Sequence, residues 1–135
     1  MSLVQWVEFP PLGDDRGSLV ALESGKTVPF KIKRVYYIFA TKPGVSRGFH
    51  AHQHLNQVAV CVTGSCRMVL DNGTDRTSVW LDAPTKGIVI NKMLWREMHD
   101  FSPDCVLLVL ADKHYDETDY IRDYKSFLEA INNES

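Results

Sequence analysis

Three of the five histidines in this chain stand at alternating positions, at His50, His52 and His54. Residues two apart on an extended strand point to the same face, so His50 and His52 are expected to converge on one side of it. An imidazole titrates near neutral pH, which suits proton transfer, and it is also a common metal ligand. The pair therefore indicates acid–base chemistry or a metal site, with a polar face on an exposed strand as the alternative.

The spacing around the pair is that of the first cupin motif. Five residues separate Gly44 from His50, one separates His50 from His52, four lead to Gln57 and six more lead to Gly64. In cupins this register turns both histidines inward. The spacing therefore predicts an all-β fold, a cupin-type antiparallel β-barrel or jelly roll.

The same motif argues against a bound metal. Metal-binding cupins carry glutamate where this chain has Gln57, and a neutral amide binds a hard cation weakly. Arg96 stands near the place of their third histidine, and a permanently charged guanidinium repels a cation. His99 and His114 lie outside the pattern and are expected on the surface or in loops. We expect no metal and no cofactor, and a pocket suited to proton transfer on an anionic substrate.

Short strands separated by turn residues must position these side chains. Apolar runs predict strands at residues 18–23, 34–41, 57–63, 66–70, 77–81, 87–90 and 105–111. Asp71, Asn72 and Gly73 predict a hairpin, because Asn and Gly tolerate a positive φ. From residue 123 onward, an amphipathic stripe predicts a short C-terminal helix that packs outside the barrel or on a partner; it consists of Tyr124, Phe127, Leu128 and Ile131.

The composition is that of an ordinary globular domain. The chain has 135 residues, 44% of them hydrophobic and 24% charged, with a net charge of −2. This length predicts a single domain over residues 1–135, and the charge balance argues against nucleic acid as a partner. No apolar run approaches the roughly 20 residues of a membrane helix, and residues 1–9 do not have the pattern of a signal peptide. The three cysteines, with Cys61 and Cys105 in valine-rich runs, indicate buried thiols and a cytoplasmic location.

Six segments of the chain resemble the dTDP-4-keto-6-deoxyglucose 3,4-ketoisomerases, small cupin enzymes of deoxysugar biosynthesis. They are DRGSLVALE (15–23), KRVYYIF (33–39), RGFHAHQHLNQV (47–58), GSCRMVLD (64–71), LWREMHDFSPDCVLLVLA (94–111) and YDETDYIRDY (115–124). The resemblance implies metal-independent isomerisation of a dTDP-linked 4-keto-6-deoxyhexose to its 3-keto isomer. It also implies a homodimer that exchanges N-terminal strands.

By position, the resemblance makes His50 and His52 the catalytic pair and Arg47 a ligand of the substrate diphosphate. The reaction removes the C3 proton, which lies α to the C4 ketone, and returns a proton to C4 through an enediol. One histidine takes the C3 proton, and the other histidine or Tyr37 donates a hydrogen bond to the oxygen or delivers the proton at C4. The sequence does not assign these roles between the two histidines. Tyr36 and Tyr37 alternate, so one faces the pocket. We expect it to be Tyr37, with Tyr36 near the substrate or in core packing.

Four further residues complete the expected substrate-binding set. Arg16 is expected in the pocket, with a surface turn as the alternative. Arg96 and Gln57 point inward by the cupin register, with a structural ion pair and a plain wall position as their alternatives. Trp95 either stacks on a base or fills the core. Residues 119–122 are expected to close the end of the barrel and cap the helix.

Three other functions fit parts of the pattern. A nucleotide-sugar 3,5-epimerase is a related metal-free cupin, but it is usually longer and uses a His–Asp pair, and no aspartate obviously partners His50. A non-catalytic nucleotide-sugar-binding cupin would turn its histidines away from the pocket. A metal-dependent oxygenase would contain stoichiometric iron, manganese or nickel.

Overall fold

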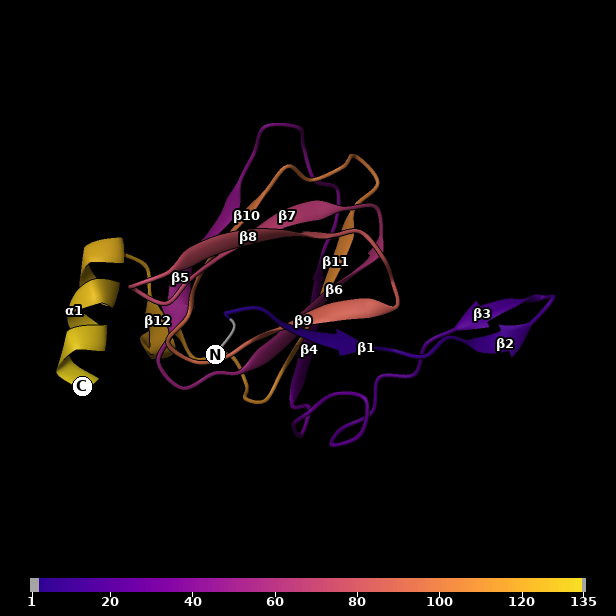
Figure 1. Cartoon of the computed structure of the whole chain (residues 1–135), viewed down its shortest axis with the longest axis horizontal. Helices are drawn as coiled ribbons and strands as arrows, with labels where there is room; N and C mark the ends of the chain where they lie inside the picture. The colour runs from indigo at the N-terminus through magenta and orange to yellow at the C-terminus, as the bar shows by residue number, and fades with distance from the viewer. Residues whose placement is uncertain (1–2, 135) are drawn as a thin grey trace.

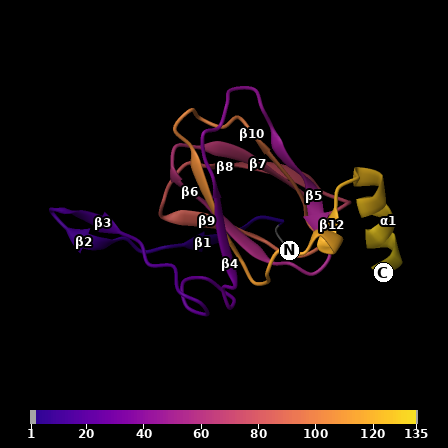
Figure 2. The ribbon, with the colours of Figure 1, turned by 180° about the vertical axis from the view of Figure 1, so that it is seen from behind.

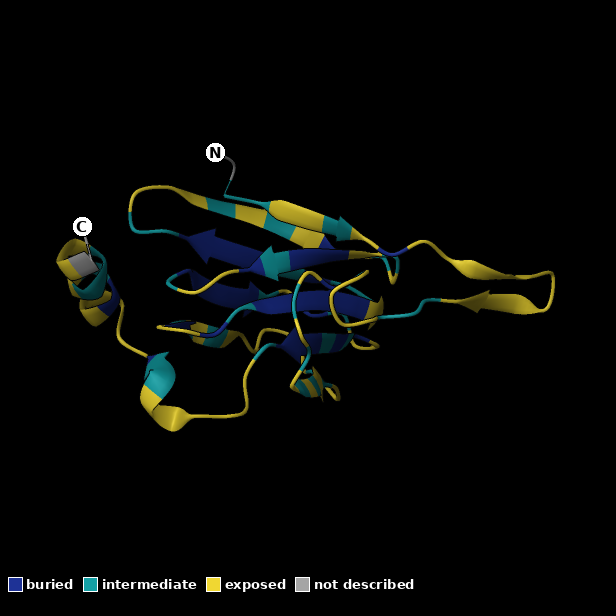
Figure 3. Ribbon diagram, turned by 90° about the horizontal axis from the view of Figure 1, so that it is seen from below, coloured by how far each residue is buried: buried dark blue, intermediate teal, exposed yellow. Residues whose placement is uncertain are grey.

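The apolar runs form two facing antiparallel sheets (Figures 1 and 3). A computed structural model describes residues 3–134. Met1, Ser2 and Ser135 lie outside this range. The predictions about a signal peptide and about a single domain over residues 1–135 include these residues. One sheet has the strand order β1-β9-β6-β11-β4 and the other has the order β12-β5-β10-β7-β8. The predicted all-β cupin class is confirmed as a jelly-roll sandwich, and the described strands do not close into a continuous barrel.

The elements have the following bounds: β1 (Gln5–Glu8), β2 (Leu12–Asp14), β3 (Gly17–Leu19), β4 (Arg34–Ile38), β5 (Arg47–His52), β6 (Gln57–Thr63), β7 (Cys66–Asp71), β8 (Arg76–Leu81), β9 (Lys86–Ile90), β10 (Trp95–His99), β11 (Val106–Ala111), a 3-10 turn (Glu117–Asp119), β12 (Tyr120–Ile121) and α1 (Tyr124–Glu134).

Most predicted strands are confirmed to within a residue at either end, as β6, β7, β8, β9 and β11. Strand β4 ends at Ile38, short of the predicted residue 41. The prediction for 18–23 is wrong beyond Leu19, because Val20 and Leu22 pack against a small apolar cluster instead of joining a ladder. The predicted hairpin joins β7 to β8, with Asn72 N–H donating to the carbonyl of Asp75 at 3.1 Å.

All three cysteines meet in the core between the sheets. Cys61, Cys66 and Cys105 are each at most 1% exposed and carry free thiols. The Sγ atom of Cys61 lies 3.7 Å from that of Cys66 and 3.6 Å from that of Cys105. Burial raises the pKa of Cys105 to about 12, and contact with Cys66 together with burial raises the pKa of Cys61. The expectation of buried thiols is confirmed, and the raised pKa values keep Cys61 and Cys105 protonated at neutral pH.

Helix α1 packs on the outside of the second sheet, as predicted (Figure 1). Phe127 is buried there together with Trp95, Ala51 and Ile121. The indole N–H of Trp95 donates to the Glu97 carboxylate at 2.9 Å. The substrate-binding role predicted for Trp95 is therefore wrong, because its side chain fills the core under the helix. Within residues 3–134, no helix is long and apolar enough to cross a membrane.

Strands β2 and β3 form a separate hairpin that stands away from both sheets (Figures 1 and 2). Leu12 pairs with Leu19 and Asp14 pairs with Gly17. Its tip carries Arg16, whose side chain is 87% exposed and forms an ion pair with Asp14 at 2.6 Å. The hairpin thus presents Arg16 far from the body of its own chain.

Candidate active site

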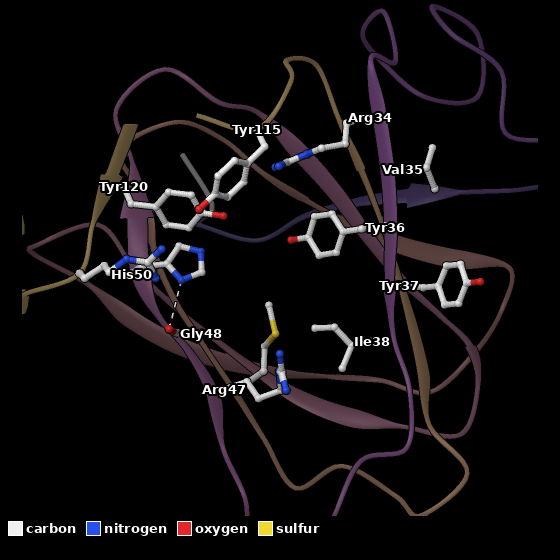
Figure 4. A pocket seen from close by; sticks show the side chains of 12 residues that line it. Arg34, Val35, Tyr36, Tyr37, Ile38, Arg47, Gly48, His50, Tyr115 and Tyr120 are labelled. Atoms are coloured by element: carbon white, nitrogen blue, oxygen red, sulfur yellow. Dashed lines mark hydrogen bonds between the residues drawn. The ribbon is translucent and has the colours of Figure 1, made fainter. Parts of the chain in front are cut away.

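A cavity of about 640 Å³ opens between the edge strand β4 and strand β5 (Figure 4). Its volume is in the range of small-molecule sites. Residues 115–122 close a further side. The lining residues are Arg34, Val35, Tyr36, Tyr37, Ile38, Arg47, Gly48, His50, Met98, Tyr115, Tyr120 and Arg122.

A β-bulge in β5 aims His50 at this cavity. Arg96 of β10 lies opposite His50 and Glu97 lies opposite Gly48, so Phe49 is the extra residue. Gly48 and Phe49 both have positive φ angles, of 92° and 57°. The carbonyl of Gly48 accepts a hydrogen bond from His50 Nδ1 at 3.1 Å (Figure 4). Because a carbonyl is only an acceptor, this contact places the proton of the neutral ring on Nδ1 and leaves Nε2 as the base.

His52 lies directly behind His50. Its ring centroid is 4.9 Å from that of His50, and it is 1% exposed. Nδ1 of His52 lies 3.1 Å from Oδ2 of Asp119, whose other oxygen accepts the backbone N–H of His54 at 2.9 Å. Nε2 of His52 is buried, and no described residue gives it a hydrogen-bond partner. The structure thus brings the two predicted histidines together and adds a carboxylate.

Arg96 places a buried positive charge beneath both histidines. It is 1% exposed, donates to the carbonyl of Leu94 at 3.1 Å and contacts the side-chain oxygen of Gln57. The ion pair considered for Arg96 is not found in the described part of the chain. Burial first, and then the charge of Arg96, lower the pKa of His50 to about 4 and that of His52 to about 2. Both imidazoles are therefore neutral at pH 7.

Tyr36, and not Tyr37, directs its side chain into the cavity. In Figure 4 the Tyr36 hydroxyl points toward His50, while the Tyr37 ring points away and is 60% exposed. The side-chain amide of Gln57 donates to the Tyr36 hydroxyl at 3.2 Å, and burial raises the pKa of Tyr36. The prediction that Tyr37 faces the pocket is wrong. Side chains alternate along β4, and Tyr36 is the one of the two on the cavity side. Gln57 and Arg96 face inward as expected, but they lie behind Tyr36 instead of lining the cavity.

The charge of the cavity wall is positive. Its lining includes Arg34, Arg47 and Arg122, and no carboxylate stands among the described lining residues. The guanidinium of Arg122 lies 4.1 Å from the ring centroid of Tyr120. Such a wall suits a phosphorylated substrate. Arg47 is one of the lining residues, whereas Arg16, expected in the pocket, is on the distant hairpin.

The segment 115–122 contributes residues to the cavity wall, although residues 119–122 were expected only to close the barrel end and cap the helix. Tyr120 pairs with His52 across β12 and β5, and its ring centroid lies 5.0 Å from that of His50. Tyr115 and Arg122 line the cavity beside it. One signal pointed to them: tyrosines, carboxylates and an arginine are concentrated in a short segment that itself resembles the family.

A family described as FdtA: WxcM-like, C-terminal matches residues 2–132 of the chain. The chain belongs to the FdtA family. A curated relative, the TDP-4-oxo-6-deoxy-alpha-D-glucose-3,4-oxoisomerase of Aneurinibacillus thermoaerophilus, is 54% identical over 125 residues. The match covers 93% of this chain and 90% of the relative.

Solved structures of 3,4-ketoisomerases share the fold of this FdtA-family chain. One from Helicobacter canadensis is 48% identical, with a TM-score of 0.93 over 96% of this chain and 97% of that one. QdtA from Thermoanaerobacterium thermosaccharolyticum, solved with TDP, is 39% identical, with a TM-score of 0.94 over 98% and 96% of the two chains. A mutant of QdtA was solved with TDP-4-keto-6-deoxyglucose.

The family resemblance read from the sequence is confirmed, and with it the enzyme class, an isomerase of the sugar 3,4-ketoisomerase type. The epimerase alternative has a weaker counterpart. The 3'-monoepimerase ChmJ of Streptomyces bikiniensis is 19% identical with a TM-score of 0.74, covering 87% of this chain and 67% of that one. At that identity the likeness shows a shared fold alone.

Proposed function

We propose that this FdtA-family protein converts TDP-4-keto-6-deoxyglucose to its 3-keto isomer through an enediol. The observation that carries the proposal is the neutral His50 on an arginine-lined cavity. Its Nδ1 donates a hydrogen bond to the Gly48 carbonyl, and its Nε2 has no hydrogen-bond partner among residues 3–134. The names of the relatives support the substrate class, since QdtA was solved with this sugar nucleotide.

In this reaction His50 Nε2 removes the C3 proton, which is acidic because it lies α to the C4 ketone. Negative charge develops on O4, where the positive charge of Arg96 and the protonated hydroxyl of Tyr36 stabilise it. Protonation of O4 gives the enediol. Loss of the O3 proton and addition of a proton to C4 then leave the ketone at C3, so no proton is gained or lost overall.

The arginines of the cavity wall bind the diphosphate. Arg47 and Arg122 are exposed at this wall, and their planar guanidinium groups fit phosphate oxygens two at a time. The guanidinium of Arg34 lies 5.3 Å from the ring centroid of Tyr36. We therefore place Arg34 between the diphosphate and the sugar.

The protein acts as a homodimer in which the hairpin of each copy reaches the cavity of the other. Strand β1 pairs with β9 of its own chain, so the exchanged elements are β2 and β3, with Arg16 between them. Exposed apolar side chains support such a contact: Val35 and Tyr37 on β4, Phe39 just after β4, and Leu12 and Leu19, which pair at the base of the hairpin. Arg16 thereby becomes a substrate ligand in the partner's cavity.

We place the enzyme in the cytoplasm, supplying deoxysugars for polysaccharide and lipopolysaccharide synthesis, and we propose that it needs no metal. The buried cation at Arg96 opposes a second cation beside His50 and His52. Treatment with a chelator, followed by gel filtration, should therefore leave the rate unchanged. A loss of activity that iron, manganese or nickel restores would contradict this.

The decisive experiment follows the sugar protons by NMR after the protein is mixed with TDP-4-keto-6-deoxyglucose. We expect the ketone signal to move from C4 to C3. His50→Asn should lower the rate by about 10²-fold or more while TDP still binds. His114→Asn, which changes a histidine outside the main cavity, is the matched control. Wild-type exchange of the C3 proton in His50→Asn would exclude His50 as the base.

The His52–Asp119 contact favours one second candidate, an epimerase, because such enzymes use a His–Asp pair. The same NMR experiment separates the two activities. An epimerase would exchange the C5 proton with solvent and leave the ketone at C4, whereas an isomerase moves it to C3.

A further inference from the structure

A second cavity, of about 190 Å³, lies behind the main one and has His52 in its wall. Its other lining residues are Arg34, His54, Leu55, Lys113, His114, Asp116, Asp119 and Tyr120. Lys113, His114 and Asp116 are exposed, so this cavity communicates with bulk water. The main cavity has His50 in its wall but not His52. The two imidazoles, packed edge to face, therefore stand between the substrate cavity and a second, water-accessible space.

Asp119 is fixed in place from several directions. Its Oδ2 faces His52 Nδ1, its Oδ1 accepts the N–H of His54, and its carbonyl accepts the N–H of Gln53 at 3.1 Å. The next residue, Tyr120, pairs with His52 in the β12–β5 ladder. The side chain of Asp119 is 11% exposed, so its carboxylate is held against the His52 imidazole and turned toward the second cavity.

This arrangement defines the protonation of His52. A carboxylate accepts, so Nδ1 of His52 carries the proton and Nε2 carries the lone pair. That Nε2 is buried and finds no partner among residues 3–134, while the ring meets His50 edge to face at a centroid distance of 4.9 Å. An unpaired buried base next to a second base is costly unless a transferring proton or a water uses it.

We propose that His52, oriented by Asp119, is a proton relay between His50 and the water of the second cavity, with Asp119 as its positioning residue. This inference rests on the isomerase activity proposed above. It adds a route by which the proton taken from C3 leaves the substrate cavity and a solvent proton returns to C4.

The proton balance of the relay is closed. His50 Nε2 takes the C3 proton and passes it, directly or through one water, to His52 Nε2. His52 releases its Nδ1 proton to Asp119, which passes it to water in the second cavity. The reverse sequence brings a solvent proton to His50 and then to C4. The nearby charges of Arg96, Arg34 and Arg122 disfavour a lasting imidazolium, so the relay passes protons on instead of storing them.

The test compares Asp119→Asn with Asp116→Asn during turnover in D2O. Asp116 is the matched control, because its carboxylate lines the same cavity without touching a histidine, and asparagine can still accept its hydrogen bond from the N–H of Thr118. In the wild type and in Asp116→Asn, we expect solvent deuterium at C4 in nearly every product molecule.

In Asp119→Asn we expect kcat to fall by about 10²-fold with KM little changed, and the C3 hydrogen to return internally to C4 in a larger share of turnovers. The ¹⁵N signals of the His52 ring should also lose the pattern of protonation fixed at Nδ1. Wild-type deuterium content in Asp119→Asn, or internal return in the wild type itself, would overturn the relay. A rise in KM alone would show a structural role for Asp119. Absence of any wild-type turnover would refute the proposed isomerase and not the relay.

Discussion

At the scale of single residues, Arg96 acts on both histidines through its charge without lining the cavity. A guanidinium cannot serve as an acid or a base near neutral pH. Its buried charge instead disfavours a second positive charge on His50 and His52, which keeps their lone pairs available.

This electrostatic arrangement predicts an unusual pH profile. Proton abstraction needs the neutral imidazole, and a lowered pKa extends the neutral form to more acidic pH. We expect kcat/KM to stay flat from pH 8 to well below the ordinary histidine pKa of about 6.5, and to fall only as the pH approaches the His50 pKa of about 4. Arg96→Gln should move this acidic limb to higher pH. A wild-type limb centred near 6.5 would contradict the assignment.

The two neighbouring tyrosines give a second test at this scale. Tyr36→Phe removes the hydroxyl that faces His50, so we expect kcat to fall by about 10²-fold. Tyr37→Phe keeps the outward ring and should leave kcat within about 2-fold of wild type. Steady-state rates for the two variants decide the matter, and equal losses would mean that the cavity does not distinguish them.

Residue spacing predicted part of this site and could not predict the rest. The alternation of His50 and His52 set their common face, and the cupin register set its direction. The alternation of Tyr36 and Tyr37 shows only that the two side chains face opposite sides of β4. It does not show which one faces the cavity, because an edge strand can expose apolar side chains on either face. Asp119 contacts His52 although the two residues are 67 positions apart in the chain, so no local sequence pattern reveals the contact.

At the scale of elements, the bulge in β5 determines where the His50 side chain points. A regular ladder would continue the alternation through Phe49, whereas the extra residue rotates His50 and brings the Gly48 carbonyl to its Nδ1. Gly48 is required twice: its φ is 92°, and an added Cβ would lie 3.2 Å from the backbone of Arg96 and Glu97.

We therefore expect Gly48→Ala to lower both stability, by about 1 kcal/mol or more, and kcat. Gly44→Ala is the control, because Gly44 also has a positive φ, of 76°, but has open space around it and lies before the strand. It should lose similar stability while retaining kcat. Urea unfolding and initial rates measure the two effects, and an unaffected kcat in Gly48→Ala would refute the role of the bulge.

Strand prediction succeeded where apolar runs coincide with ladder partners and failed where they do not. Strands β6, β7 and β11 are apolar because they cross the core. Strand β10 carries Arg96 and Glu97, so its sequence resembles a surface segment although both side chains are buried. Val20 and Leu22 have strand-like composition but pack as side chains on a loop.

For the molecule as a whole, the homodimer proposed above would share each active site between two copies through the projecting hairpin. Its consequence can be measured by co-expressing Arg16→Ala with His50→Asn, each of which we expect to be nearly inactive alone. In a mixed dimer, one cavity combines an intact His50 with an intact Arg16. Random pairing makes about half of the dimers mixed, with one working site of two, so about a quarter of wild-type activity should return. No recovery in a verified mixed dimer would show that each hairpin serves its own chain.

Because Cys61, Cys66 and Cys105 lie together in the core, their reaction with a dye can report when the two sheets separate. A thiol-reactive dye needs access to the sulfur, and the folded core buries all three cysteines. The raised pKa values of Cys61 and Cys105 disfavour their thiolate forms as well. Native protein should label at none of its three cysteines and denatured protein at all three. The speed of labelling at an excess of dye then times how often the two sheets come apart.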